Sequence, residues 1–504
     1  MNVMNKKAEK RAGVGPNSRQ RPVHRKQDEA KFDPQKEAFK LASGGVPFSD
    51  SSGTAYIRFN RDNDGGETYA IDSREFSKAF RLLFYREHGR LLIVVVFEIV
   101  RAQLLAEAGS KRDEVFLRVG AAGDTIYLDL CNATREVLEI SAGGLKINRF
   151  PPINFIRPKT MKALPTPRAK KCTLRVLLKI ILPQLNEKGL LIVAVFLVGS
   201  LNPSGPYMLL QLVGLQGSGK STLLKMIKRL LDAAALEGRS LPRTERDLMI
   251  AAQHCRVLCF DNVSQLPQWL SDAFYRISTG GGMGTRELFS NGGEVVFDAL
   301  RPVLINGIGD VIDRPDLKER TLVLNMPEVR KRRTEQEIWK EFDEVCPSIL
   351  GVLARCVVAV LSPSSLPEPE NLPRMADCYL FVRRALPVMG FTPELLDEVM
   401  EENRRGASLS VLEASPVAQA VIAYMTTHDE LTGTATELWS RLRVKQEYVC
   451  ELRDWPGDGR ALSNELRRVE PELRAVGIYV IHRKSREKRT ILIAKTAPAS
   501  EEEA

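Results

Sequence analysis

Near its middle the sequence reads Gly214-Leu-Gln-Gly-Ser-Gly-Lys-Ser-Thr222. This run fits G-x-x-x-x-G-K-[ST], in which glycines let backbone N–H groups turn inward around phosphate oxygens. The preceding residues 209–213 are mostly apolar, as in a buried strand, and residues 223–227 repeat apolar side chains at helical spacing. Strand, loop and helix in this order predict the phosphate-binding loop of a nucleoside triphosphatase within an α/β domain.

The loop predicts a site for ATP and Mg²⁺. Lys220 would reach the β and γ phosphates, and the Ser221 hydroxyl would ligate Mg²⁺. The N-terminus of the following helix adds partial positive charge. The loop residues expected to contact the nucleotide or its metal are Gly214, Gly217, Ser218, Gly219, Lys220, Ser221 and Thr222.

Two later strands end in polar residues that suit the same site. Residues 257–260 are apolar and lead into Asp261, which would hold the water shell of the metal, so Ser221 and Asp261 are the expected Mg²⁺ residues. Residues 302–305 lead into Asn306, whose amide would lie beside the γ phosphate and orient the attacking water. The alternative for Asp261 is an ordinary core strand that ends in an acid.

Arg314 and Arg320 follow the strand that ends at Asn306. An arginine in this position can reach the γ phosphate of a neighbouring subunit and offset the charge that develops during transfer, which requires a ring of subunits. The alternative is a surface ion-pair role, because Asp313, Asp316 and Glu319 are close in sequence.

Together these motifs resemble those of the superfamily 3 helicases. The resemblance rests on the pair Asp261-Asn262, the segment Ile277-Ser-Thr-Gly-Gly-Gly-Met-Gly-Thr-Arg286-Glu-Leu-Phe, the strand that ends at Asn306, and Arg320. It points most closely to the AAA+-like ATPase module of phage, plasmid and poxvirus primase-helicases and of related mobile-element ATPases. The resemblance covers about 205–330, and it implies a homo-hexameric ring acting on single-stranded or forked DNA.

In that family a basic residue and a hairpin project into the pore of the ring and grip single-stranded DNA. Carried over, Arg286 is the DNA-contacting candidate, on a hairpin with strands 286–289 and 294–297 that turns at 290–293. The sequence departs from the family in two places. Asn262 stands where an acid usually serves as the hydrolytic base, which implies another carboxylate or slow hydrolysis, and the hairpin tip lacks the Lys or His of several relatives.

The sequence predicts a multidomain protein. Its expected parts are a disordered basic arm (1–45), a mixed α+β domain of unknown role (46–168), the P-loop ATPase core (169–330), a helical lid (331–410), a winged-helix domain (411–497) and an acidic tail (498–504). Of the net charge of +10, much lies in residues 1–40, where eleven Lys and Arg face five acids. The arm is therefore expected either to hold polyanions loosely or to be a solvated tail.

Within the mixed domain, Ser73 is expected to cap a helix, and residues 115–140 look like an antiparallel meander. Asp129 stands alone in its strand, and one acid does not make the two-metal site that nucleotidyl transfer needs. The Pro-rich stretch 150–167 is expected to be a linker.

The lid is predicted from helical periodicity. A capping box at Thr334 and Glu337 marks the start of its first helix. We interpret the basic run 330–333 before it as a solvated helix entry rather than a DNA patch.

The C-terminal pattern predicts a winged helix. The first helix is expected at 416–425, the second begins after a cap formed by Thr434 and Glu437, and the third is expected at 461–469. A hairpin over 478–494 is expected to follow them. The basic wing suits phosphate contacts, although winged helices also bind proteins. The candidate DNA contacts are Arg483, Lys484, Arg486, Lys488 and Arg489.

The composition predicts a cytoplasmic protein with no membrane partner. The apolar runs Leu91–Phe97 and Leu190–Val198 are shorter than the roughly 20 residues of a spanning helix, so both are expected in cores. No apolar signal-peptide core follows the basic N-terminus. The eight cysteines include no C-x-x-C pair, so free buried thiols are expected, and His254-Cys255 with Cys259 comes nearest to a metal cluster.

The expected function is that of an ATP-dependent DNA helicase or translocase of a phage or mobile genetic element, acting in DNA replication with replication partners. A first alternative is an ATP-binding switch or scaffold with slow turnover that recruits a partner through its winged helix, which Asn262 favours. A second is a primase-helicase with polymerising activity in 46–165, which the missing acid set disfavours.

Overall fold

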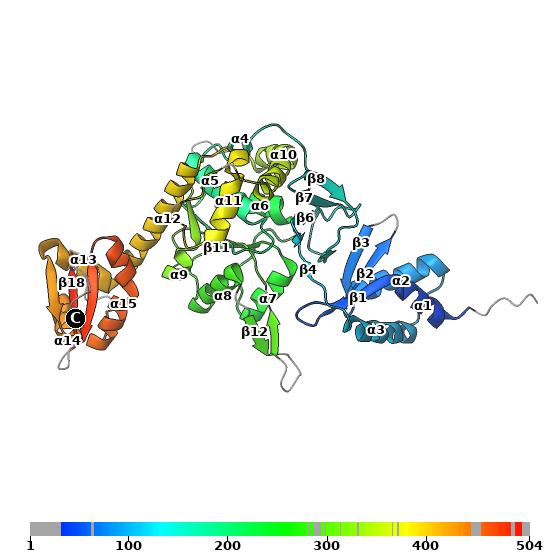
Figure 1. Ribbon diagram of the computed structural model, residues 1–504, viewed down its shortest axis with the longest axis horizontal. Helices are drawn as coiled ribbons and strands as arrows, with labels where there is room; N and C mark the ends of the chain where they lie inside the picture. The colour runs from blue at the N-terminus through cyan, green and yellow to red at the C-terminus, as the bar shows by residue number, and fades with distance from the viewer. Residues whose placement is uncertain are drawn as a thin grey trace, which may run out of the picture.

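The computed structural model describes residues 32–61, 65–280, 283–286, 294–297, 299–312, 314–329, 332–364, 366–369, 372–444, 455–484 and 489–495. The chain forms a multidomain α/β protein with a parallel sheet and its helices at the centre (Figure 1). Antiparallel sheets lie in the regions before and after this central part.

Four parallel strands form the central sheet: β10 (Leu209–Val213), β11 (Leu258–Val263), β14 (Val303–Gly307) and β15 (Thr321–Asn325). Their order across the sheet is β11-β14-β10-β15. These strands are largely apolar because helices cover both faces of the sheet. Since neighbouring strands run in the same direction, their carboxyl ends lie at one edge, where the loops after β10, β11 and β14 converge.

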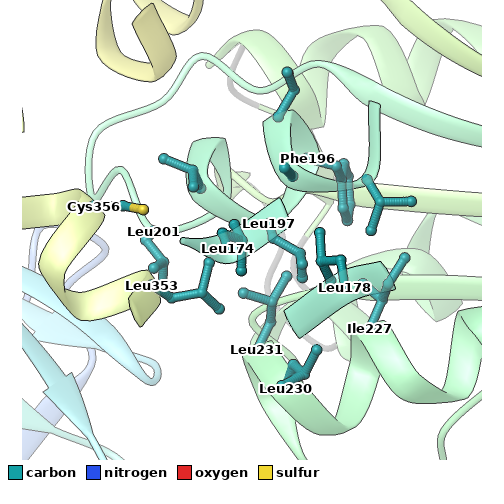
Figure 2. Close-up of a cluster of buried hydrophobic side chains, with 14 of the residues drawn as sticks. Leu174, Leu178, Phe196, Leu197, Leu201, Ile227, Leu230, Leu231, Leu353 and Cys356 are labelled. Carbon is teal, nitrogen blue, oxygen red and sulfur yellow. The ribbon is translucent and has the colours of Figure 1, made fainter. Parts of the chain in front are cut away.

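Side chains of the sheet alternate between two apolar cores. Leu210 and Leu212 of β10 belong to the larger core, and Leu209 belongs to the smaller one. The larger core is built with α4 (Leu174–Ile181), α5 (Glu187–Gly199), α6 (Lys220–Asp232), α10 (Glu335–Leu361) and α11 (Ala376–Met389). The smaller core is built with α7 (Glu245–His254), α8 (Gln268–Thr279) and α9 (Pro315–Lys318). Figure 2 shows part of the larger core, where Leu197 of α5, Leu231 of α6 and Leu353 of α10 lie in one cluster of buried side chains.

Two apolar helices occupy the interior of the larger core. The run Leu190–Val198 lies within α5 and is buried throughout, which confirms its prediction as a core segment. Among the single helices that the structure describes, α10 alone is long and apolar enough to cross a membrane, and 61% of its apolar stretch is buried inside the protein. The core helix of a water-soluble domain meets the same criterion.

Three helices, α10, α11 and α12 (Pro393–Ala414), make up most of the described chain between residues 332 and 414, and the sequence predicts a helical region there. The predicted capping box is present at the start of α10: the Glu337 N–H donates to Thr334 Oγ1 at 3.3 Å, and the Thr334 N–H donates to Glu337 Oε2 at 3.0 Å. The last of these helices, α12, continues past residue 410, where the lid was expected to end.

The N-terminal region holds α1 (Pro34–Ala42), the antiparallel strands β1 (Gly45–Ser49), β2 (Ala55–Arg61) and β3 (Gly65–Ala70), and the helices α2 (Arg74–His88) and α3 (Val94–Ala108). The predicted Ser73 cap of α2 is confirmed. The predicted extent of the disordered arm is wrong at its C-terminal end, because 34–42 is helical. Asp33 caps that helix, and Ala38 and Ala42 pack into the core of this region, which outweighs the basic composition.

The apolar run Leu91–Phe97 is only partly a core segment. Leu92, Val96 and Phe97 are buried, but Leu91 is 82% exposed, and Val95 is 66% exposed. The run includes the start of α3 at Val94. Its side chains therefore point in different directions around the helix axis, and only those on one face of α3 pack on the sheet. The sequence pattern indicates apolar character but not which face is covered.

The antiparallel meander expected at 115–140 is present but displaced along the chain: residues 115–116 are not part of it, and its four strands are β5 (Val119–Ala122), β6 (Thr125–Asp129), β7 (Val137–Ser141) and β8 (Gly144–Asn148). A short parallel pair, β4 (Val115–Phe116) and β9 (Asn154–Phe155), flanks it. The stretch expected to be a linker is packed instead, with Ile153 and Leu164 buried. Its apolar residues reach the neighbouring cores, which a count of prolines does not reveal.

A buried arginine attaches the meander to the central domain. Arg118 is fully buried, and its guanidinium donates to the carbonyl oxygens of Lys162 at 2.8 Å and Ala233 at 3.1 Å. It also lies 3.6 Å from the carboxylate of Asp232, at the C-terminal end of α6. Lys228 donates to the same carboxylate at 2.5 Å. The meander and α6 therefore share one buried charge network.

The C-terminal region is formed by α13 (Pro416–Thr427), β16 (Glu430–Gly433), α14 (Ala435–Val444), α15 (Gly459–Ala475), β17 (Tyr479–Lys484) and β18 (Arg489–Ala494). The strands form an antiparallel sheet in the order β16-β18-β17. The three helices and the final hairpin lie where the sequence predicts them. The short strand β16 was missed, because its four residues, Glu430–Gly433, give too little alternation to detect.

Candidate nucleotide-binding site

The strand and helix expected on either side of the glycine-rich loop are present. The loop leaves β10 at Val213 and enters α6 at Lys220. Gly219, just before α6, has φ of +84°, a backbone conformation that residues other than glycine rarely adopt. A Cβ atom on Gly214 would lie 2.9 Å from the carbonyl oxygen of Met326, so only glycine fits there. The loop is therefore a fixed turn at the carboxyl edge of the sheet.

Lys220 points its ammonium group into the loop. Its Nζ donates to the carbonyl oxygens of Gly214 at 2.7 Å and Leu215 at 2.9 Å. The side chain is nearly buried, and this burial lowers the pKa of Lys220, while the nearby Asp261 raises it. A cation held by loop carbonyls at a helix N-terminus is suited to exchange those carbonyls for phosphate oxygens.

Three of the predicted residues meet beside the loop. Ser221 Oγ donates to Asp261 Oδ1 at 2.9 Å. The amide of Asn306 donates to the same carboxylate oxygen at 2.5 Å and to Ser221 Oγ at 3.2 Å. These side chains come from the starts or ends of α6, β11 and β14, which the sheet order brings together.

This cluster fits Mg²⁺ better than a metal held by protein ligands alone. A hydroxyl and a carboxylate oxygen 2.9 Å apart, at Ser221 and Asp261, offer the hard oxygen ligands that Mg²⁺ prefers, with phosphate and water completing the shell. Among the described residues, no group of three or more His, Cys, Asp and Glu side chains could hold a metal ion. His254 hydrogen-bonds the Ile250 carbonyl, and burial raises the pKa of Cys259 to about 12, so that thiol stays protonated.

Asn262 lies at an irregularity within β11. Its φ of +59° lies in the left-handed region, which Asn tolerates better than most residues, and the pairing of β11 with β14 is irregular between Phe260 and Val263. The Asn262 N–H donates to Asn306 Oδ1 at 3.0 Å, and its side chain is exposed. The residue after Asp261 thus has an exposed amide side chain, not a carboxylate, and joins the site through its backbone N–H.

The two finger candidates make contacts within their own chain. Arg314 pairs with Asp272 of α8 and also donates to Asp316 at 3.2 Å. The guanidinium of Arg320 lies over the ring of Tyr275 at 4.5 Å and donates to its hydroxyl at 3.1 Å. Arg314 therefore has the ion pairs that its alternative role predicts, whereas Arg320 is held by an aromatic side chain.

The predicted hairpin is present with a shifted first strand. β12 (Met283–Arg286) pairs antiparallel with β13 (Glu294–Phe297), with Arg286 opposite Glu294. The first strand was expected at 286–289. It lies at 283–286 instead, because Met283 pairs with Phe297 and Arg286 pairs with Glu294. Residues 287–293, including the expected turn, lie outside the described residues. The pair projects from the end of the central domain near α7 and α8 (Figure 1).

The basic hairpin at the C-terminus is described in part. Arg483 and Lys484 end β17, Arg489 begins β18, and all three side chains are exposed. Arg486 and Lys488 lie outside the described residues.

Sequence reasoning missed one basic residue near the loop. Arg332 lies between β15 and α10, and its Nη2 is 3.9 Å from the position that a Cβ atom on Gly217 would occupy. The available signal was the basic run 330–333, which was interpreted as a solvated helix entry. Nothing in its local pattern distinguishes one arginine of the run from the next.

Comparison with known proteins identifies two regions of the chain. Residues 176–384 match the family described as actinomycete integrative conjugative element replication protein, and residues 417–502 match the AICE RepA C-terminal domain. Together the two matches cover more than half of the chain. No curated protein matches it.

Similar solved structures include an apo structure of the NrS-1 C-terminal region, which is 14% identical, with 92% of this chain and 99% of that chain covered and a TM-score of 0.38. Another is a structure of JCV helicase bound to a small molecule, which is 11% identical, with 50% of this chain and 65% of that chain covered and a TM-score of 0.26. Because both TM-scores are below 0.5, neither likeness supports an inference about this chain.

Proposed function

Because the chain belongs to the family of actinomycete integrative conjugative element replication proteins, we propose that it is an ATP-dependent DNA helicase or translocase that replicates such an element. The observation that carries this proposal is the meeting of Ser221, Asp261 and Asn306 beside Lys220. These residues lie at the carboxyl edge of a parallel sheet, the place where α/β proteins bind ligands.

In this proposal ATP and Mg²⁺ bind at the glycine-rich loop. The backbone N–H groups from Gly214 to Thr222 surround the phosphates, and Lys220 neutralises the charge of the β and γ phosphates. Ser221 and Asp261 hold the metal. The Asn306 amide, fixed by both of them, orients the attacking water.

Turnover in this proposal depends on a ring. An arginine from the neighbouring subunit stabilises the charge that develops on the γ phosphate, as such arginines do in other nucleoside triphosphatases. Arg320 is the better candidate, because Arg314 already has carboxylate partners in its own chain. A homo-hexamer gives each site such a neighbour.

DNA contacts in this proposal come from two hairpins. The β12–β13 pair carries Arg286 toward single-stranded DNA in the ring, and the C-terminal domain acts as a winged helix whose hairpin residues Arg483, Lys484 and Arg489 contact phosphates. Exposed Arg and Lys on a β-hairpin give sequence-independent affinity that falls with salt. Replication partners and a cytoplasmic location follow from this role.

The proposal is tested by steady-state ATP hydrolysis with and without single-stranded DNA. The wild-type protein is expected to hydrolyse ATP several-fold faster with DNA, and Lys220→Ala is expected to abolish both rates. Turnover equal to that of Lys220→Ala and indifferent to DNA would refute the motor proposal.

A second candidate function is an ATP-binding switch that turns over slowly and recruits a partner through its C-terminal domain. It is favoured by Asn262, whose exposed amide cannot act as a base. Asn262→Glu is expected to raise turnover sharply if the missing carboxylate limits the rate, whereas Asn262→Gln, the matched control without a charge, leaves it low. Equal rates in the two variants would remove this candidate.

A further inference from the structure

The chain between β15 and α10 begins directly beside the glycine-rich loop. The Met326 N–H donates to the carbonyl oxygen of Val213 at 2.7 Å, so the chain after β15 stays paired with the last residue of β10. The Met326 carbonyl oxygen lies where a side chain on Gly214 would clash, 2.9 Å from the Cβ position. One end of the connection is therefore fixed at the first residue of the loop.

The other end of the connection is held along the helix that follows the loop. The capping box of Thr334 and Glu337 fixes the start of α10. One turn further on, the ring of Trp339 lies 3.7 Å from the guanidinium of Arg229 in α6. Both ends of the connection are therefore anchored beside the loop or the helix that follows it.

Arg332 lies shortly before the start of α10. Its Nη2 is 3.9 Å from the position of a Cβ atom on Gly217, in the middle of the loop. Arg333, the next residue, turns away and donates to Glu341 at 2.7 Å. Within the part of the chain that the structure describes, no ion pair joins Arg332 to a carboxylate, whereas Arg333 has one.

Arg332 adds to the positive charge around the loop. The N-terminus of α6 carries partial positive charge, and Lys220 adds a full charge inside the same loop. Arg332 is a third positive group beside them, so a negatively charged ligand in the loop would be attracted by all three.

We infer that Arg332 binds a phosphate of the nucleotide in its own subunit. This inference rests on the proposed function and names a further residue of that site. Gly217 is in the middle of a loop whose N–H groups surround the α and β phosphates, so Arg332 contributes to binding of nucleoside diphosphates and triphosphates alike. Because it acts within one chain, its contribution needs no ring, unlike that of Arg320.

The test is the affinity of ATP and ADP for the full-length protein, measured by fluorescence with a labelled nucleotide and competition. A charge-assisted hydrogen bond at a partly exposed site corresponds to about a tenfold change in affinity. Arg332→Ala is expected to weaken both nucleotides about tenfold, and Arg332→Lys less. Arg333→Ala, the matched control with the same loss of charge one residue away, is expected to stay within about twofold.

The outcomes separate this inference from the proposed function. Binding that Lys220→Ala abolishes but Arg332→Ala leaves unchanged overturns the inference alone. A wild-type protein that binds neither nucleotide overturns both. A loss in Arg332→Ala that appears only at protein concentrations where subunits assemble shows action on a neighbouring subunit, and also overturns the inference. Because Arg332 is exposed, thermal unfolding of the variant is expected to match the wild type.

Discussion

Replacing Asn306 with Ala tests whether the amide organises the candidate site. The side chain is only 2% exposed and makes three hydrogen bonds: to Asp261 at 2.5 Å, to Ser221 at 3.2 Å, and from the Asn262 N–H at 3.0 Å. The first of these involves a carboxylate and the other two join neutral groups. Asn306→Ala removes all three at once and leaves Asp261 free to turn.

The expected effect on turnover is large and the effect on binding is small. Removing one oriented donor from a catalytic site typically lowers the rate by about 10²-fold, or about 2.7 kcal/mol in the barrier. Lys220 and the loop remain, so the Kd of ATP is expected to change by less than about threefold. Single-turnover hydrolysis and equilibrium binding, measured on the same preparation, separate the two effects.

Asn325 supplies the matched control. It ends β15, which pairs with β10 on the side opposite to β14, and its side chain is exposed. Asn325→Ala removes the same amide from a neighbouring strand end and is expected to leave turnover within about twofold. A rate for Asn306→Ala within threefold of the wild type, in a protein that still binds ATP, would refute the assignment of Asn306 to the reaction.

Three further predictions concern stability, DNA and metal. Asp232→Asn leaves Lys228 unpaired and is expected to lower the unfolding free energy by about 3–5 kcal/mol, seen as a lower urea midpoint by tryptophan fluorescence. Although burial opposes its ionisation, Lys228 lowers the pKa of Asp232 below its ordinary 3.8. The stabilisation from this ion pair is therefore complete above about pH 4 and is lost as the pH falls further. The unfolding free energy of the variant should accordingly change less with pH in this acidic range. Arg483→Ala should weaken DNA binding and reduce the slope of log affinity against log salt by about one, whereas Lys495→Ala, a paired lysine beside the same sheet, should not. Chelating Mg²⁺ should abolish turnover, and Ser221→Ala should need several-fold more Mg²⁺ for half-maximal rate; equal requirements would exclude Ser221 as a ligand.

Short-range patterns predicted much of the fold. The loop with its strand and helix, the caps at Ser73 and Thr334, and the C-terminal helices each depend on residues within a few positions of one another. Hydrogen bonds and side-chain spacing within one turn decide such features, so the sequence contains them directly.

Contacts between distant segments could not be predicted in the same way. The burial of Arg118 against the end of α6 depends on where the meander docks, and the exposure of Leu91 depends on which face of α3 is covered. Arg332 is one of four consecutive basic residues in the sequence, and only its contact distance to Gly217 in the folded chain places it at the loop.

The strand order explains why the site contains an asparagine where it does. In the sequence β14 follows β11, yet in the sheet it lies between β10 and β11. A residue at its end therefore faces the loop helix on one side and Asp261 on the other. An amide can donate to the carboxylate and to Ser221 while its oxygen accepts the Asn262 N–H, and neither a carboxylate nor a hydroxyl can make all three bonds. An acid at position 306 would also repel Asp261. The polar residue that ends this strand is thus required to be an amide by its two neighbours, before any nucleotide binds.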